Sequence, residues 1–273
     1  FSHETLTGLV KSHLRFSFRK FVDWHNARLA SRFDHVIATT AFASREFEDI
    51  KVDNLVNIPL GVDLETFSPE LRNTQLRKEL LKEQEVLLIH LGRMSSEKNP
   101  QNSILTLIEL RKRGVNARLV YVGMGPMFAK LKQLAADHPV TFLGYIVDRK
   151  KLAEIMASAD VSIAPGPIET FCLAALESLA SGTPVVASAT SAVGEFLMLD
   201  SRSPVGAIAE NKPEAFADAI QNVLLRKNQD PNFSQNCHHQ AENFPWSSTL
   251  MMMLRLHGAG REVTALRRNL RAA

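Results

Sequence analysis

Short apolar runs alternate with amphipathic stretches from residue 86 to residue 209 of the 273-residue chain. Stretches between the runs, such as NSILTLIELRKRG and PMFAKLKQLAAD, carry apolar residues at helical spacing. The runs are apolar at nearly every position, which is typical of strands covered on both faces. This alternation predicts an α/β fold with a parallel, doubly wound sheet. The predicted strands are VLLIHLG (86–92), ARLVYVG (117–123), VTFLG (140–144), DVSIAP (160–165), PVVAS (184–188) and VGAIA (205–209).

Residues 1–63 show a similar pattern on a smaller scale. FDHVIATT (33–40) and LVNIPLG (55–61) have the composition of strands, and AFASREFEDI between them has a helical pattern. Two strands and two or three helices cannot enclose a domain core, and the first residue is Phe1 rather than Met. We therefore expect the numbering to start inside a longer polypeptide, with residues 1–63 forming the second half of an N-terminal α/β domain.

The rest of the chain divides into two further parts. GVDLETFSPE (61–70) is expected to connect the N-terminal domain to a second α/β domain at residues 64–245. After residue 245, WSSTLMMMLRLHG and an Arg-rich end predict C-terminal helices over 246–273, which we expect to return to the N-terminal domain. The methionine run Met251–Met253 is interpreted as core filler.

Polar residues and glycines follow four of the predicted strands at the point where each strand ends. The loops read GRMSSEKNP, GMGP, GYIVD and PGPIETF in chain order. Ligands of open α/β sheets bind beyond the carboxyl ends of the strands, so we expect the four loops to open on one edge. The residues that should converge there are Arg93, Lys98, Gly125, Tyr145 and Glu169.

The loop GRMSSEK contains two cations beside a predicted helix start. Its serines are expected to cap the helix that begins near Pro100. Arg93 and Lys98 next to a helix N-terminus predict an anion site. The alternative is that Lys98 only pairs with Glu97 on the surface. The loop lacks the P-loop pattern, and GMGP lacks the third glycine of a dinucleotide fingerprint.

Two carboxylates, Glu169 and Glu177, stand in PGPIETFCLAALESLASGTPVVAS, with no Lys or Arg between Lys151 and Arg202. The helix around Glu177 is apolar on nearly all sides, which predicts burial of this residue. A buried carboxylate needs hydrogen-bond donors, and we expect neutral ones such as the hydroxyls of a ligand. If both glutamates lay on one helix, roughly 12 Å would separate them along its axis. That distance exceeds the roughly 5–9.5 Å of a glycosidase carboxylate pair.

The segment between the two glutamates predicts an anion site. First-turn amides near Phe171 and Leu173 would point out of a helix N-terminus, ready for a phosphate. The predicted order along the chain is a carboxylate that binds hydroxyls, an anion site and a second carboxylate that binds hydroxyls. A sugar nucleotide has the matching order of sugar, diphosphate and ribose. The alternative is that Glu169 caps the helix and Glu177 faces water.

Charge and cysteine content narrow the class of protein. Because the chain carries +3 and residues 1–33 and 255–273 each carry +4, the middle carries −5. With an acidic middle and no binding motif, no nucleic-acid partner is expected.

Cys172 and Cys237 suggest no disulfide framework and indicate a reducing, cytoplasmic compartment. No apolar run approaches the roughly 20 residues of a membrane span, and the Cys237–His239 run is interpreted as solvated helix rather than a metal site.

The N-terminal stretch KSHLRFSFRKFVDWHNARLASRF interleaves cations with Phe16, Phe18, Phe21 and Trp24. Such a mix suits the interface between water and an anionic membrane, which here would be the inner face of the plasma membrane. The alternative is an ordinary helix whose aromatic side chains pack into the N-terminal domain.

Four segments, in this order along the chain, resemble one protein family. IPLGVDLETFSP resembles the interdomain segment of the retaining GT-B glycosyltransferases of family 4, and GRMSSEK resembles their diphosphate-binding segment. PxxxETFCLAALESLASGTPVV is similar to their donor-sugar motif of two glutamates, and FPWSSTLMMMLRLH to their C-terminal F-x-W helix. The match covers nearly the whole chain. PLGVD and PGPIETF look most like actinobacterial GDP-mannose-dependent α-mannosyltransferases that build lipomannan-type glycolipids.

The resemblance implies two Rossmann-like domains and transfer of a hexose, mannose from GDP-mannose, to a lipid-linked or glycan acceptor. It implies retention of configuration, no metal or other cofactor, and a donor phosphate that takes the acceptor proton. Arg93 and Lys98 would hold the donor diphosphate, and His3 would lie near the acceptor and the reacting sugar. Glu169 would bind sugar hydroxyls, and Glu177 would bind the ribose. The other implied donor-binding residues are Tyr145 and Ile146, which would flank the base, and Gly92, Gly125, Phe171, Cys172 and Leu173.

Two features depart from the family pattern. Cys172 stands where the family usually has glycine, and it would crowd the site if its φ is positive. The glycine-rich loop and acceptor pocket of the family are expected to precede residue 1. The alternatives are a UDP-sugar-dependent transferase of the same family and a truncated or non-catalytic sugar-nucleotide-binding protein. A nucleotide-dependent oxidoreductase would need G-x-G-x-x-G and an acidic residue about 20 positions later, and residues 86–123 contain neither.

Overall fold

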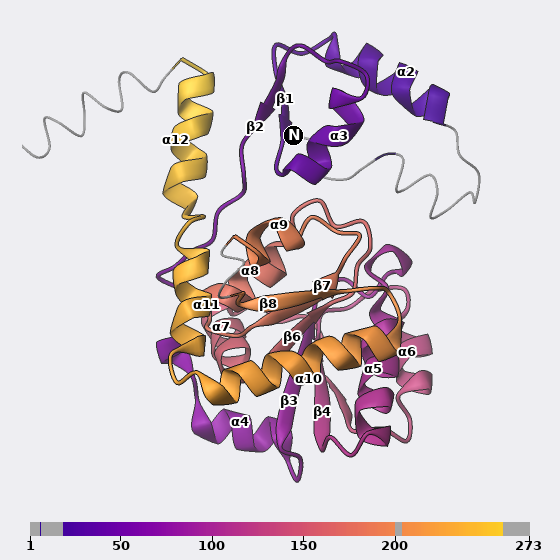
Figure 1. Ribbon diagram of the computed structural model, residues 1–273, viewed down its shortest axis with the longest axis vertical. Coiled ribbons are helices and arrows are strands. Elements are labelled where there is room, and N and C mark those ends of the chain that lie inside the picture. The colour runs from indigo at the N-terminus through magenta and orange to yellow at the C-terminus, as the bar shows by residue number, and fades with distance from the viewer. Residues whose placement is uncertain (1–5, 7–18, 200–203, 259–273) are drawn as a thin grey trace, which may run out of the picture.

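The computed structural model of the chain describes residues 6, 19–199 and 204–258, which form two units (Figure 1). The smaller unit, at the top of Figure 1, contains a parallel sheet of two strands. Helices α2 and α3 pack together, and α3 contacts both strands of this sheet. The elements are α2 (Arg19–Ala30), β1 (Val36–Ala38), α3 (Ala41–Glu48) and β2 (Leu55–Asn57).

The larger unit is built on a six-stranded parallel sheet in the order β5-β4-β3-β6-β7-β8. The chain adds strands on one side of β3, crosses back, and adds the remaining strands on the other side. This is the order of a doubly wound sheet, and its switch point lies between β3 and β6. All six strands fall inside the predicted segments, so the predicted α/β fold is confirmed. The strands are β3 (Val86–Leu91), β4 (Ala117–Val122), β5 (Val140–Phe142), β6 (Val161–Ala164), β7 (Val185–Ser188) and β8 (Gly206–Ala209).

Successive side chains of β3 point to opposite faces of the sheet. Leu88 packs in the main core with α5 and α10, whereas Leu87 and Ile89 pack with α4 and α7. Burial on both faces explains why this strand is a continuous apolar run. The helices around the sheet and the short 3₁₀ turn before α4 are η1 (Pro69–Leu71), α4 (Thr74–Leu81), α5 (Pro100–Lys112), α6 (Phe128–Leu134), α7 (Arg149–Ser158), α8 (Leu173–Ala180), α9 (Gly194–Leu197), α10 (Pro213–Gln229) and α11 (Phe233–Ala241).

Two chain segments cross between the units and are bound to each other. Val62, on the connection that follows β2, forms an isolated parallel bridge with Pro245. The backbone N–H of Val62 donates to the carbonyl of Phe244 at 2.8 Å, and that of Trp246 donates to the carbonyl of Val62 at 3.4 Å. Gly61 permits this contact, because a Cβ there would lie 2.5 Å from the Trp246 backbone. The two crossings therefore form one double connection.

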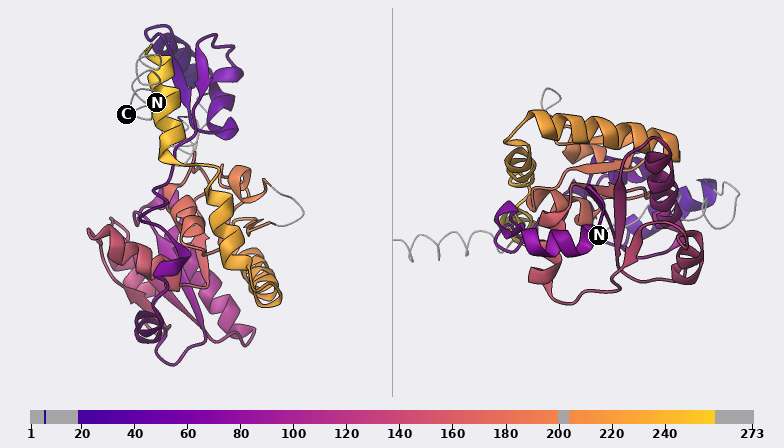
Figure 2. Two further views of the ribbon diagram at one scale, coloured as in Figure 1. Left: turned by 90° about the vertical axis from the view of Figure 1, so that its left-hand side faces the viewer. Right: turned by 90° about the horizontal axis from the view of Figure 1, so that it is seen from below.

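Helix α12 (Trp246–Leu256) runs beside the smaller unit, as the two views in Figures 1 and 2 show. Its Thr249 Oγ1 donates to the carbonyl of Pro59 at 2.8 Å. Met252 is 42% exposed and Met251 and Met253 are half-buried. The interpretation of the methionine run as core filler is therefore wrong, because the described part of α12 lies on the surface of the smaller unit.

A buried ion cluster fixes the amino end of the large sheet. Asp160, just before β6, accepts hydrogen bonds from Arg77 Nη2 at 2.7 Å, Leu87 N at 2.8 Å and Lys227 Nζ at 3.4 Å. Arg72 lies 3.9 Å from the same carboxylate. Burial lowers the pKa of Lys227, and Asp160 opposes that shift by raising it. One carboxylate thus pairs with cations from the segments on either side of the sheet.

Replacement of Asp160 by alanine is expected to destabilise the protein by roughly 3 kcal/mol, because it leaves the half-buried Arg77 and Lys227 without their carboxylate and the Leu87 N–H without its acceptor. Thermal unfolding should show a much lower midpoint for Asp160→Ala than for wild type. Asp137→Ala, at an exposed position, is the control and should stay close to wild type. Similar midpoints for the two variants would contradict the role of the cluster.

Candidate functional site

Three loops meet at the carboxyl edge of the large sheet, around the switch point between β3 and β6. The first follows β3 and the second follows β4, and backbone hydrogen bonds join them. Met94 N donates to the carbonyl of Met124 at 3.1 Å, and Met127 N donates to that of Met94 at 2.9 Å. The third loop follows β6 and leads into α8. The first two loops therefore form one continuous wall of the site.

Glycines allow the first two loops to approach each other. A Cβ on Gly123 would lie 2.1 Å from the carbonyl oxygen of Gly92, and one on Gly125 would lie 2.5 Å from that of Met94. Gly92 and Gly123 also have φ angles of 144° and 129°, which other residues rarely adopt. Gly125 lines none of the three cavities described below, whereas Met124 lines one. In this structure Gly125 serves loop packing.

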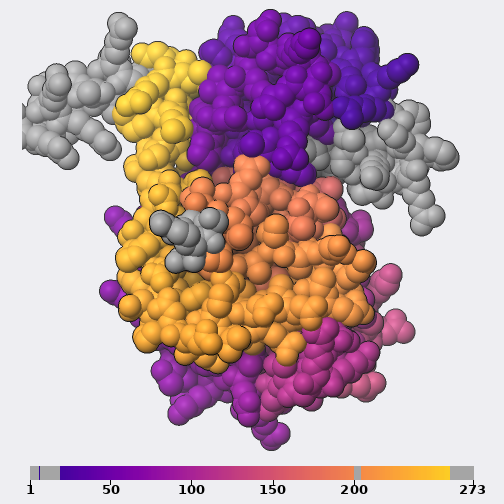
Figure 3. Space-filling view, in the orientation of Figure 1, coloured from indigo at the N-terminus to yellow at the C-terminus, as the bar shows by residue number. Residues whose placement is uncertain are grey.

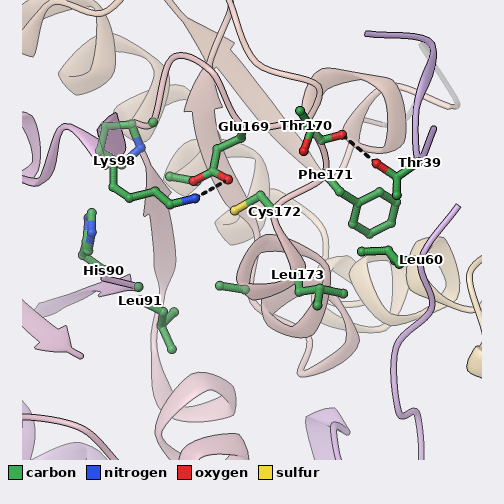
Figure 4. A pocket seen from close by; sticks show the side chains of 15 residues that line it. Thr39, Leu60, His90, Leu91, Lys98, Glu169, Thr170, Phe171, Cys172 and Leu173 are labelled. Atoms are coloured by element: carbon green, nitrogen blue, oxygen red, sulfur yellow. Dashed lines mark hydrogen bonds and ion pairs between the residues drawn. The ribbon is translucent and has the colours of Figure 1, made fainter. Parts of the chain in front are cut away.

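The first cavity, of about 230 Å³, lies between the two units at the N-terminus of α8 (Figure 4). Thr39 and Leu60 of the smaller unit line one side of it. On the other side Lys98 Nζ donates to Glu169 Oε2 at 2.8 Å, and the two side chains are 32% and 12% exposed. Lys98 therefore faces the cavity, and its pairing is not limited to its sequence neighbour Glu97.

The serines of the first loop do not cap a helix as predicted. Ser95 precedes a short 3₁₀ turn, η2 (Ser96–Lys98), and makes no side-chain capping bond. Its hydroxyl donates to the carboxylate of Glu97 instead. Helix α5 does begin at Pro100, as predicted. The capping prediction is wrong because the 3₁₀ turn separates the serines from α5.

Helix α8 begins beside the cavity without a side-chain cap. Its N-cap residue, Cys172, has a φ of 69°, so a cysteine occupies a left-handed conformation that favours glycine. Phe171, Cys172 and Leu173 all line the cavity. Burial raises the pKa of the Cys172 thiol, which keeps it protonated at neutral pH. Ala175 N donates to the carbonyl of Cys172 at 3.0 Å. The amides that precede it at the N-terminus of α8 supply positive partial charge here.

The two glutamates do not share a helix. Glu169 lies in the loop before α8, so the axial separation expected for two residues of one helix does not apply. Glu177 lies within α8, with its side chain 16% exposed, and accepts a hydrogen bond from Arg149 Nη2 at 3.1 Å. Burial raises the pKa of Glu177, while Arg149 lowers it. The expectation of neutral donors alone is wrong, because α7 supplies a cation from 28 residues earlier in the chain.

Two further cavities adjoin α8, and Glu177 lines both. One, of about 450 Å³, is mostly apolar. The other, of about 550 Å³, lies where the units are connected and is lined by residues 61–65, Arg149 and Trp246. Of the predicted site residues, Gly92, Lys98, Glu169, Phe171, Cys172 and Leu173 line the 230 Å³ cavity, and Gly92, Arg93, Tyr145, Ile146 and Glu177 line the 450 Å³ cavity. His3 lies outside the described residues.

His90, which was not among the predicted site residues, lines the 230 Å³ cavity near the end of β3. His90 is 2% exposed, its Nδ1 lies 2.9 Å from Ser103 Oγ, and its ring lies 4.8 Å from that of Tyr121. Burial, helped by the charge of Lys98, lowers its pKa to about 3, so the imidazole is neutral at pH 7. One histidine in an otherwise aliphatic strand was the signal that could have identified it.

The Cys237–His239 run does not form a metal cluster. Cys237 is fully buried and its Sγ donates to the carbonyl of Val205, while His238 Nδ1 lies against the carbonyl of Ala180. The interpretation of this run as solvated helix is therefore wrong for Cys237. Among the described residues, no three His, Cys, Asp or Glu side chains are arranged to hold a metal ion.

Contacts between the units involve the loop that carries Glu169 and helix α9. Thr39 Oγ1 donates to the carbonyl of Thr170 at 3.3 Å (Figure 4). Thr40 Oγ1 donates to the same carbonyl at 2.7 Å. Glu195 of α9 accepts from the first two amides of α3, at 2.9 and 2.6 Å. A carboxylate from the larger unit thus caps a helix of the smaller one. In Figure 3 the smaller unit rests directly on the larger one.

The chain has a GT-B-like fold, as predicted, and solved structures share it. The HepE protein of Anabaena, in complex with UDP and glucose, matches with a TM-score of 0.76 and 19% identity, covering 94% of this chain and 70% of that one. Sucrose-phosphate synthase from Thermosynechococcus elongatus matches with a TM-score of 0.74 and 23% identity, covering 96% and 67%. The class of protein is thus a two-unit α/β protein with its site at the switch point of the large sheet.

The chain belongs to the family described as Glycosyl transferases group 1, which matches residues 72–241. It is 45% identical over 259 residues to the GDP-mannose-dependent alpha-(1-6)-phosphatidylinositol dimannoside mannosyltransferase of Mycobacterium tuberculosis, covering 94% of this chain and 66% of the relative. It is 32% identical over 208 residues to a D-inositol 3-phosphate glycosyltransferase of Mycobacteroides abscessus, covering 72% and 45%. The family resemblance inferred from the motifs is confirmed.

Loss of the Glu195 carboxylate is expected to loosen the contact between the units. Glu195→Ala removes a helix cap of a kind worth about 0.5–2 kcal/mol. Small-angle X-ray scattering should then give a larger radius of gyration than wild type, with Glu195→Gln in between. Glu214→Ala, at an exposed position on α10, is the control. Identical scattering from Glu195→Ala and wild type would show that this cap does not hold the units together.

Proposed function

We propose that the chain is part of a retaining glycosyltransferase that moves a hexose from a nucleoside diphosphate to a lipid-linked or glycan acceptor. The observation that carries the proposal is the arrangement around α8, where Lys98 and Glu169, an uncapped helix N-terminus and Glu177 follow one another. The identity to the GDP-mannose-dependent enzyme of M. tuberculosis supports GDP-mannose as donor. HepE binds UDP, which supports a UDP-sugar as the alternative donor.

The three cavities suggest how the donor lies. Arg93 and Lys98 come from one loop but line different cavities, so a diphosphate between them would contact both cations and the amides of α8. The sugar would then occupy the 230 Å³ cavity beside Glu169. Ribose and base would occupy the 450 Å³ cavity, with Glu177 at the ribose and Tyr145 and Ile146 at the base.

The proposed reaction uses electrostatic stabilisation rather than a carboxylate nucleophile. Lys98, Arg93 and the N-terminus of α8 would stabilise negative charge on the departing diphosphate, which would take the acceptor proton. Glu169 is held by Lys98 and would orient sugar hydroxyls. In the same proposal, His3 would lie near the acceptor, and the reaction would require no metal.

The proposed division of the chain follows the same scheme. Residues 1–63 would belong to the acceptor domain, residues 64–245 would form the donor domain, and residues 246–273 would return to the acceptor domain. We propose a cytoplasmic location, with docking on the inner face of the plasma membrane. The lipomannan-type acceptor implied by the resemblance would be reached from that surface.

Calorimetric titration with GDP and UDP tests the donor, and GDP is expected to bind more tightly. Arg93→Ala should weaken GDP binding by on the order of tenfold or more, since a hydrogen bond to a charged group contributes roughly 1.5–3 kcal/mol. Guanosine affinity and the thermal midpoint should change little. Lys130→Ala on α6 is the control.

Three outcomes would count against the proposal in different ways. No heat with either nucleotide on folded protein would reject the donor site. Equal losses for GDP and guanosine in Arg93→Ala would reject the contact of Arg93 with the diphosphate. Binding of GDP-mannose without any release or transfer of mannose would favour the non-catalytic alternative.

Helix α2 supports the membrane part of the proposal. Phe21 and Trp24 are 58% and 57% exposed, so the described part of the smaller unit does not cover them. The exposed Lys20 lies next to Phe21, and the Arg28 guanidinium lies 5.8 Å over the ring of Trp24. Phe16 and Phe18 lie outside the described residues. No helix that the structure describes has both the length and the apolar character needed to cross a bilayer.

Vesicle co-sedimentation tests the docking of α2. Binding should require anionic lipid and fall as salt rises, since each cation near such a surface contributes about 1 kcal/mol. Lys20→Gln with Arg28→Gln should weaken binding, whereas Lys130→Gln with Lys132→Gln on α6 should not. Equal binding to neutral vesicles, or no change in the α2 variant, would exclude this mode of docking.

A further inference from the structure

Arg149, the first residue of α7, contacts two separate parts of the larger unit. Its Nη2 donates to Glu177 Oε1 of α8 at 3.1 Å. Its guanidinium carbon lies 5.0 Å from the ring centroid of Phe67, a fully buried residue of the connecting segment. The side chain itself is 55% exposed, so it reaches Glu177 from the surface. No motif of the sequence had singled out Arg149.

The cavities show from which side Arg149 reaches the carboxylate. Glu177 lines both the 450 Å³ and the 550 Å³ cavity, whereas Arg149 lines only the 550 Å³ cavity beside the connecting segment. Arg149 therefore holds Oε1 from the side away from the mostly apolar cavity. The opposite side of Glu177 remains accessible to a ligand in the 450 Å³ cavity.

The ion pair with Arg149 affects the protonation state of Glu177 and therefore its capacity to accept hydrogen bonds. A carboxylate that is 16% exposed and lacks a partner is costly, and it lowers that cost by taking up a proton. A protonated carboxyl group has fewer acceptor sites and makes weaker bonds to hydroxyls than a carboxylate does. Arg149 keeps Glu177 in its acceptor form and fixes one oxygen, which leaves the other lone pairs for two neighbouring hydroxyl donors.

We propose that Arg149 is a positioning residue for the ribose of the nucleotide, acting through Glu177 from the far side of that carboxylate. The inference rests on the proposed donor-binding function and deepens it. Arg149 then determines how strongly the site distinguishes a ribose with both hydroxyls from a sugar that lacks them. The proposal requires no contact between Arg149 and the ligand.

A cycle of variants and ligands tests the proposal, with GDP and 2′,3′-dideoxy-GDP as probes. Arg149→Met should weaken GDP binding on the order of tenfold, which is about 1.4 kcal/mol, and should change dideoxy-GDP affinity by less than about twofold. Arg149→Lys should restore part of the GDP affinity. Lys150→Met, an exposed cation in the same helical turn, is the matched control and should leave both affinities unchanged.

The combination with Glu177→Gln completes the cycle. If Arg149 acts through Glu177, Arg149→Met should cost almost nothing further in a Glu177→Gln background. Equal losses for GDP and dideoxy-GDP in Arg149→Met, or full additivity with Glu177→Gln, would overturn the inference and leave the donor site in place. A wild-type protein that does not bind GDP would refute the proposed function and this inference with it.

Discussion

The pairing of β3 with both β4 and β6 is the contact on which the candidate site depends. It makes the loops after β3 and β6 begin side by side and then diverge, one toward α5 and the other toward α8. The crevice between them brings together Lys98 and Glu169, which lie 71 residues apart in the chain. The first-turn amides of α8 face the same crevice. A sheet with its strands in simple sequential order would not create this gap.

Charge in the site is balanced before any ligand arrives. Each carboxylate around α8 has a cation from another segment, Lys98 of the turn after β3 for Glu169 and Arg149 of α7 for Glu177. These pairs lower the cost of burying charge and hold the side chains in defined positions. The side chains around a diphosphate that enters between Arg93 and Lys98 are therefore already oriented, so its binding loses little free energy to ordering them.

The fold and the location of the site could be predicted because both follow from local patterns. Continuous apolar runs marked the six strands, and the rule that parallel strands end on one edge placed Arg93, Lys98 and Glu169 together. The partners of the glutamates could not be predicted, since Arg149 reaches Glu177 only through the packing of α7 against α8. The serine caps failed for a similar reason: the turn that separates them from α5 depends on left-handed Asn99, which sequence periodicity does not show.

The bridge between Val62 and Pro245 has a mechanical consequence. Two chain segments bound side by side resist separation. The relative motion of the units that costs the least free energy is therefore rotation about that double connection. The contacts of Thr170 and Glu195 lie away from this axis and would part first, while the pair of Lys98 and Glu169 lies wholly within the larger unit and stays intact. The smaller unit can thus rotate away from the larger one, as about a hinge, without disturbing the arrangement of charges in the larger unit.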